Sequence, residues 1–100
     1  MDELEVSRAK ILRGQIIIKL YSTYGEDISL NVLKGMLRYT GECRDSEIKK
    51  AMYYLGGEQK RYIKLKLNDE NYMDSQVWLT PAGVNLAEGD ITDVGVDLNE

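Results

Sequence analysis

The sequence contains no histidine, a single cysteine and a single proline. Without histidine, the chain lacks both the commonest metal ligand and the commonest general base of enzymes. Cys43 has no second cysteine for an intrachain disulfide, and a lone cysteine is most often a small buried apolar residue rather than a nucleophile. The chain also shows no nucleophile paired with a base, no phosphate-binding loop and no metal cluster. We therefore expect a protein that is not an enzyme and that binds neither a metal nor a cofactor.

Long apolar runs are absent as well. The longest, "III" at residues 16–18, is far shorter than the ~20 residues that a membrane span needs. The charged start "MDELEVSRAK" lacks the apolar core of a signal peptide. With 100 residues, 43% of them hydrophobic and 30% charged, the chain is typical of one small globular domain. We expect it to be cytoplasmic.

Basic residues are missing from the last third of the chain. Residues 1–33 hold 4 bases and 5 acids, residues 34–66 hold 9 bases and 4 acids, and residues 67–100 hold 8 acids and no base. A basic middle segment is the electrostatic footprint expected for phosphate binding, whereas an acidic last third is not. Any nucleic-acid contact is therefore expected between residues 34 and 66.

Helical periodicity is present in three segments. The first, residues 5–24, has a wide apolar stripe at helical spacing. The second follows Ser29, whose hydroxyl can cap it. The third begins at Asp45 or Ser46 and should be broken by Gly56-Gly57, with a frayed continuation to Lys60 as the alternative. The side chains of the third helix that should face the core are Ile48, Ala51, Met52 and Leu55.

Strand periodicity follows the third helix. Residues 62–67 alternate between an apolar side, formed by Ile63, Leu65 and Leu67, and an outer side, formed by Tyr62, Lys64 and Lys66. Residues 76–80 alternate as well, so the two segments predict a hairpin whose tip is the octet "NDENYMDS", residues 68–75. If the turn is symmetric about residue 71, Lys64 lies opposite Trp78 and Lys66 opposite Gln76. A very short additional strand is predicted within "EDIS", residues 26–29.

The chain closes with a short helix and a tail. Thr80 is a natural N-cap, and Pro81 at the first helical position costs no hydrogen bond. The tail has no clear period and should run extended over the surface or be partly disordered. The element order predicts an α+β, mainly α, winged helix-turn-helix: three helices, a two-stranded β-hairpin wing and a short C-terminal helix in residues 1–90, followed by an acidic C-terminal tail, residues 91–100.

Three motifs carry a family resemblance. They are Ser29-Leu30-Asn31 at a helix start, Leu79-Thr80-Pro81-Ala82-Gly83 at a strand exit, and Gly95-Val96 near the end. Together with their surroundings, about residues 11–96, they resemble the small winged-helix proteins of Mu-like phages and prophages. The resemblance implies a phage-associated winged helix and supplies no catalytic residues. The chain departs from that family in "GGEQKR", residues 56–61, which is longer and more basic than the family's usual short turn.

The outward face of the third helix is the candidate DNA-recognition surface. Its side chains are expected to be Ser46, Lys49, Lys50 and Tyr53, and the nearby bases that would hold the phosphate backbone are Lys34, Arg38, Lys60 and Arg61. Lysine and serine contact base edges or phosphates, and tyrosine usually contacts phosphates. The alternative is an ordinary solvated lysine face. We predict a regulator of transcription that places this helix in the major groove of double-stranded DNA.

Trp78 is the candidate contact for a protein partner. The predicted register puts it on the outer face beside Lys64, within cation–π range. Either the first helix or the tail covers this tryptophan, or it is an exposed anchor for another protein, since tryptophan is over-represented at binding hot spots. The second case would make the domain a protein-interaction module without DNA binding.

The acidic octet limits how a wing could meet DNA. Asp69, Glu70 and Asp74 would repel phosphates, so the tip should be held away from a duplex. The octet is not an EF-hand, because the glycine at loop position six is missing and the twelfth position counted from Asp69 is Thr80 rather than glutamate. Charges at a hairpin tip also keep strand edges soluble, which is the simpler explanation.

The first helix is more apolar than one small core needs, and Ile11 and Ile18 fall outside its stripe. Winged-helix proteins often dimerise through their first and last helices, so we predict a homodimer through the first helix and the C-terminal segment. The alternative is a monomer with scattered apolar residues on its surface, which are normal.

Overall fold

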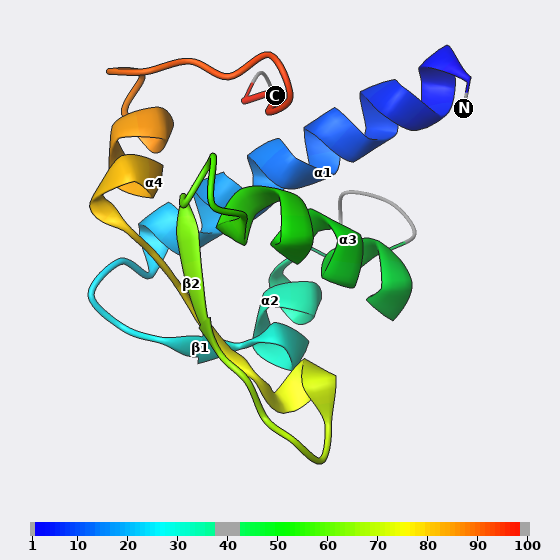
Figure 1. Cartoon of the computed structure of the whole chain (residues 1–100), viewed down its shortest axis with the longest axis vertical. Helices are drawn as coiled ribbons and strands as arrows, with labels where there is room; N and C mark the ends of the chain where they lie inside the picture. The colour runs from blue at the N-terminus through cyan, green and yellow to red at the C-terminus, as the bar shows by residue number, and fades with distance from the viewer. Residues whose placement is uncertain (1, 38–42, 99–100) are drawn as a thin grey trace.

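The computed structural model describes residues 2–37 and 43–98, in which four α-helices surround a small antiparallel sheet (Figure 1). The elements in chain order are α1 (Glu3–Ser22), β1 (Ile28–Ser29), α2 (Leu30–Met36), α3 (Asp45–Gly56), β2 (Ile63–Lys66), the short 3-10 helix η2 (Tyr72–Asp74), β3 (Gln76–Leu79) and α4 (Pro81–Ala87). The predicted α+β, mainly helical fold class is therefore confirmed.

The sheet has three strands in the order β1-β3-β2, all antiparallel. The hairpin register agrees with the prediction, because Lys64 pairs with Trp78 and Lys66 with Gln76. The very short strand expected near residue 28 is confirmed as β1, where Ile28 pairs with Val77. The central strand is therefore the last in sequence, which leaves β2 at an edge of the sheet.

Side-chain caps define the starts of α1, α2 and α4. Ser29 accepts a hydrogen bond from the backbone N–H of Val32 at the start of α2, and Thr80 accepts one from Gly83 at the start of α4. Helix α3 differs from the prediction, because its cap position is Arg44, whose side chain makes no capping hydrogen bond. Its first turn contains Asp45 and Glu47 instead, and their charges favour the positive end of the helix dipole.

The core lies between α1, the inner faces of α2 and α3, and the sheet. All four apolar side chains predicted for α3 are buried, and Ile63, Val77 and Leu79 of the hairpin are buried with them. The predicted alternation fails at the two ends of β2. Tyr62 is buried rather than outward, because Arg61 adopts a positive φ of 54° just before the strand. Leu67 lies beyond the strand's last residue and is 66% exposed.

The C-terminal segment belongs to the folded domain. After Gly89, with φ of +82°, the chain returns over α1, where the N–H of Asp97 donates to the carbonyl of Lys10 over 3.0 Å (Figure 1). Val96 is part of the core. This corrects the expectation of a tail that only runs over the surface, and it moves the structured part of the domain well past residue 90. At Gly14 of α1, a Cβ atom would collide with the carbonyl of Asp97.

The wide apolar surface of α1 is largely used within one chain. Helix α1 packs against α2, α3, α4 and β3. The C-terminal segment covers a further part of it at Gly14. Leu4 and Ile11 remain exposed, at 66% and 40%. No helix in the described part of the chain is long and apolar enough to cross a membrane.

Candidate functional site

The outward face of α3 presents all four side chains predicted for it. Ser46, Lys49, Lys50 and Tyr53 are exposed, Tyr53 at 73%. Because the opposite face of α3 is fully buried in the core, this face is held rigidly toward solvent. The structure therefore brings these four predicted residues together on one helix.

The two lysines of this face diverge into different grooves. Lys49 lines a groove of about 640 Å³ between α3 and β2, where its ammonium lies 5.0 Å from the ring centroid of Tyr72. Lys50 lines a groove of about 550 Å³ between α1 and α3, together with Arg8, Arg44 and other residues. A ligand lying along α3 would therefore meet positive charge on both flanks of the helix.

The side chains predicted to hold the phosphate backbone of DNA are less available for that contact than the outward face of α3. Lys34 forms a 2.6 Å ion pair with Asp45, and this hydrogen bond raises the pKa of Lys34. Arg61 is exposed beside the start of β2. Arg38 lies outside the described residues. Lys60 takes part in a contact within the fold, with the carboxylate of Asp93.

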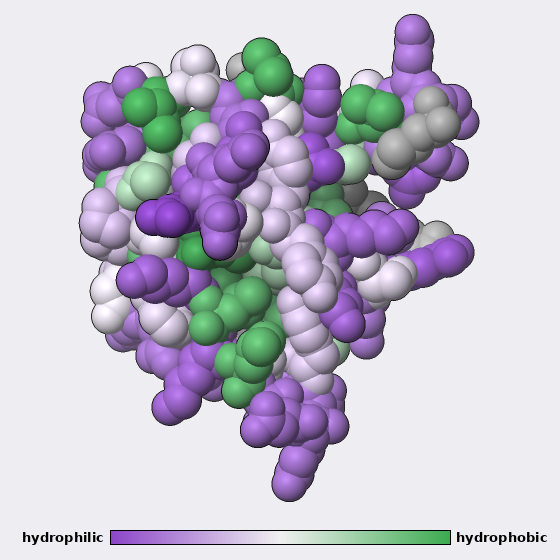
Figure 2. Space-filling model, in the orientation of Figure 1, coloured by the Kyte–Doolittle hydropathy of each residue, from purple (hydrophilic) through white to green (hydrophobic). Residues whose placement is uncertain are grey.

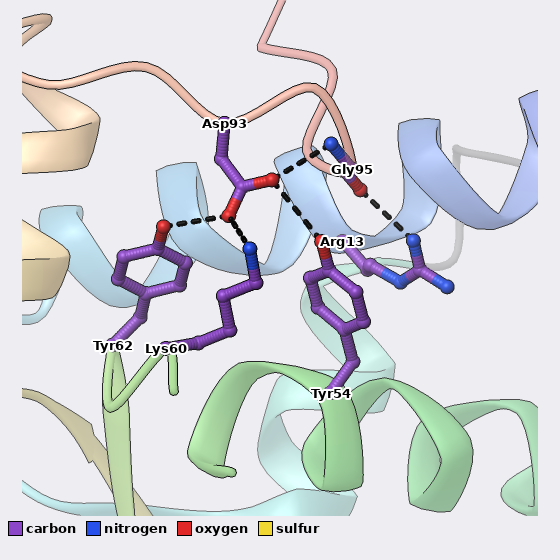
Figure 3. A network of polar contacts seen from close by, with 6 residues as sticks. All are labelled: Arg13, Tyr54, Lys60, Tyr62, Asp93 and Gly95. Atoms are coloured by element: carbon purple, nitrogen blue, oxygen red, sulfur yellow. Dashed lines mark hydrogen bonds and ion pairs between the residues drawn. The ribbon is translucent and has the colours of Figure 1, made fainter. Parts of the chain in front are cut away.

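Asp93 is the centre of a polar network that links the C-terminal segment to α3 and to the start of β2 (Figure 3). Its side chain is only 3% exposed. Four donors contact the carboxylate: the Tyr62 hydroxyl at 2.6 Å, the Gly95 N–H at 2.7 Å, the Lys60 ammonium at 2.8 Å and the Tyr54 hydroxyl at 3.1 Å. Burial alone would raise the pKa of Asp93, but these donors outweigh it and hold that pKa well below its usual range.

Two aromatic rings form the walls of this network. Burial and the hydrogen bond to Asp93 raise the pKa of Tyr62 to about 12. Arg13 stacks 4.0 Å from the ring centroid of Tyr54 and donates a 2.9 Å hydrogen bond to the carbonyl of Gly95. The arrangement fixes the C-terminal segment, and Lys60 neutralises the buried carboxylate of Asp93, so we interpret the network as a structural clasp.

Trp78 is half-buried and lies at the border of two grooves. It lines the groove between α3 and β2, and also a second groove of about 590 Å³ that it shares with Tyr24, Lys64, Lys66 and others. Figure 2 shows apolar side chains gathered on the face that carries β2 and α3, above the hydrophilic loop at the bottom of the view. The strand register confirms that Trp78 lies opposite Lys64 on the neighbouring strand, as predicted.

The acidic octet is folded onto α2. Met73 is buried, and the Asn31 amide donates a 2.9 Å hydrogen bond to the carboxylate of Asp74. The side chain of Asn68 accepts hydrogen bonds from two backbone N–H groups of the loop. Asp69 and Glu70 remain exposed at the tip. The loop is thus a rigid acidic ridge at one end of the groove between α3 and β2.

Cys43 is half-buried, and burial raises the pKa of its thiol. In residues 2–37 and 43–98, no three acidic or cysteine side chains cluster in a way that could hold a metal ion. Neither a protein-family model, nor a curated protein, nor a solved structure matches the chain.

Proposed function

We propose that the protein is a winged-helix DNA-binding protein, and that α3 is its recognition helix. Two helices, α2 and α3, precede an antiparallel hairpin in the order that a winged helix requires, and the short β1 completes the sheet. The likeness of its motifs to small winged-helix proteins of Mu-like phages supports a role as a phage or prophage regulator of transcription.

The observation that carries the proposal is the outward face of α3. Two hydroxyl groups flank two adjacent lysines on it, along a helix whose other face is buried, as a helix entering a major groove requires. Ser46, Lys49, Lys50 and Tyr53 would contact bases and phosphates. Arg61 would reach the backbone from the start of β2. Lys60 is a weaker candidate than the sequence indicated, because Asp93 already neutralises it.

The acidic tip restricts the docking. Asp69 and Glu70 are exposed on the loop that leads into η2, which packs against α2, so their charges lie on an ordered part of the wing. Phosphates would be repelled there. The proposed complex therefore uses α3 and Arg61 and leaves the tip of the wing outside the minor groove.

Selection from random DNA duplexes, followed by fluorescence anisotropy on the enriched sequence, tests the proposal. The double variant Lys49→Ala/Lys50→Ala should weaken binding strongly and reduce the salt slope, which changes by about −0.9 for each phosphate contact. Lys10→Ala/Lys19→Ala removes the same charge from α1 and is the matched control. A duplex Kd weaker than about 10⁻⁴ M for the parent protein, with no effect of the α3 variant, would reject DNA binding.

A second candidate function is protein interaction without DNA binding. The groove between α3 and β2 favours it, because Tyr53 and Leu67 are exposed there beside the half-buried Trp78. Under this alternative, Trp78→Ala should abolish partner binding while duplex affinity stays negligible.

Self-association of the protein through α1 is a separate prediction. Sedimentation equilibrium measures it directly.

A further inference from the structure

Strand β2 is an open edge of the sheet. In residues 2–37 and 43–98, it pairs with β3 alone. The end of α3 packs against its far side at Ile63, whose carbonyl oxygen would lie 3.7 Å from a Cβ on Gly56, and beside this contact a groove of about 640 Å³ lies between α3 and β2. An edge strand leaves a row of backbone donors and acceptors unpaired, and an extended peptide can satisfy them by joining the sheet.

The groove follows this edge rather than one face of the sheet. Side chains of successive strand residues point to opposite faces, yet Ile63, Lys64 and Leu65 all line the same groove. Only a groove that runs along the strand's rim can touch both sets. It therefore gives access to the backbone of β2 as well as to its side chains.

The lining of the groove selects a type of peptide. Leu65 and Leu67 offer apolar contacts, and Lys49 and Lys64 place positive charge near both walls. A strand that alternates apolar and acidic residues would place its apolar side chains toward α3 and its carboxylates against the lysines. Asp69, at the loop end, would oppose a further acid there.

We propose that the open edge of β2 binds an extended segment of a partner protein, with alternating apolar and acidic residues, as an added strand of the sheet. A second copy of this chain fits less well, because antiparallel pairing of two β2 strands would set the exposed Lys64 and Lys66 of one copy against those of the other. This site is distinct from the outward face of α3 proposed for DNA, although Lys49 and Tyr53 border both.

The protein carries its own reporter for this site. Trp78 is the only tryptophan in the chain and lines the groove, so its emission should change when a peptide excludes water from it. The probe is a synthetic hexapeptide of alternating valine and glutamate. A peptide of alternating valine and lysine tests charge, and a probe N-methylated at alternate residues tests backbone pairing. The Val-Glu probe should bind saturably, and both altered peptides should bind far more weakly.

Charge reversal separates recognition from a structural effect. Lys64→Glu should lower affinity for the Val-Glu probe by roughly fivefold and should improve binding of the Val-Lys peptide. Lys19→Glu on α1 makes the same charge change away from the groove and should leave both affinities unchanged. Amide exchange of β2 should slow in the presence of the Val-Glu probe, because the added strand protects its N–H groups.

Three results would overturn the proposal. The first is equal binding of the N-methylated probe, which would exclude strand addition. The second is a Trp78 emission change that grows with protein concentration alone, which would assign the edge to a second copy. The third is a response to oligothymidylate but not to the peptide, which would assign the groove to single-stranded nucleic acid. Lys50→Ala, whose side chain lines the other groove, separates this outcome from duplex binding, because it should weaken duplex affinity without affecting the peptide.

Discussion

The Tyr62 hydroxyl donates a 2.6 Å hydrogen bond to Oδ2 of Asp93, which lies 31 positions later in the chain. The same carboxylate joins the end of α3, the start of β2 and the C-terminal segment into one unit (Figure 3). A chain of 100 residues buries limited apolar surface, so a polar clasp of this kind is a sizeable part of its stability.

Replacing Asp93 with asparagine tests the clasp. The substitution keeps the size of the side chain but removes the charge that accepts from Lys60 and both tyrosines. Since hydrogen bonds to a charged group contribute more than neutral ones, we expect a loss of about 2 kcal/mol in the free energy of unfolding. Urea denaturation followed by circular dichroism measures it. Asp90→Asn, at an exposed site of the same segment, should change stability little, and an equal loss there would contradict the role of Asp93.

Acid should weaken the clasp. The pKa of Asp93 is lowered in the folded protein, so its stabilising contribution is complete above the ordinary aspartate pKa of about 3.9 and is lost as the pH falls below it toward the folded pKa. Other carboxylates titrate in the same range, so the useful quantity is the difference in urea midpoint between the parent and Asp93→Asn. That difference should shrink from pH 5 downward, and a constant gap would disprove the linkage.

High pH should also weaken the clasp, through ionisation of Tyr62. The pKa of Tyr62 is raised to about 12, so the folded state retains a proton that the unfolded chain loses at about 10. Its contribution is therefore complete below about pH 10 and is lost as the pH rises toward 12. Titration of tyrosinate absorbance should show a late step in the parent that Tyr62→Phe removes. A late step that persists in the variant would assign it to another tyrosine.

Two helical glycines should respond with opposite signs. Alanine normally stabilises a helix relative to glycine, and none of the described residues lies within 4 Å of where a Cβ on Gly35 of α2 would be, so Gly35→Ala should stabilise by about 0.5 kcal/mol. Gly14→Ala would drive its Cβ into the carbonyl of Asp97, so it should destabilise by about 1–3 kcal/mol. Thermal or urea unfolding compares the two. A stabilising Gly14→Ala would mean that the C-terminal segment does not lie against α1.

The acidic tip of the wing should control affinity for DNA. Asp69→Lys with Glu70→Lys replaces repulsion by attraction beside α3, so non-specific duplex binding should tighten and its salt slope should steepen by up to about −0.9 for each new phosphate contact. Glu88→Lys with Asp90→Lys makes the same charge change at the end of α4 and is the control. Equal gains in both variants would point to net charge rather than to the position of the wing.

Much of the fold follows from local patterns. The caps at Ser29 and Thr80, the buried face of α3 and the pairing of Lys64 with Trp78 depend on residues close in sequence. They were predictable from capping residue types, helical periodicity and a symmetric hairpin loop, respectively. The outward lysines of α3 followed from the same periodicity, because fixing the buried face of a helix also fixes its exposed one. Tyr62 was misplaced because the alternation takes no account of a positive φ at Arg61.

The clasp and the groove could not be predicted in this way. Asp93 stands in a segment without periodicity, and its partners come from α3, from the start of β2 and from its own turn, so no local pattern indicates the pairing. The open edge of β2 likewise depends on the strand order β1-β3-β2, which is a property of the assembled sheet. The sequence by itself therefore determined the elements, their buried faces and the hairpin register, because these arise from short-range geometry. Only the tertiary structure decided that Lys60 forms an ion pair with Asp93 and that β2 is an edge strand beside α3. Both features depend on segments that meet only after folding.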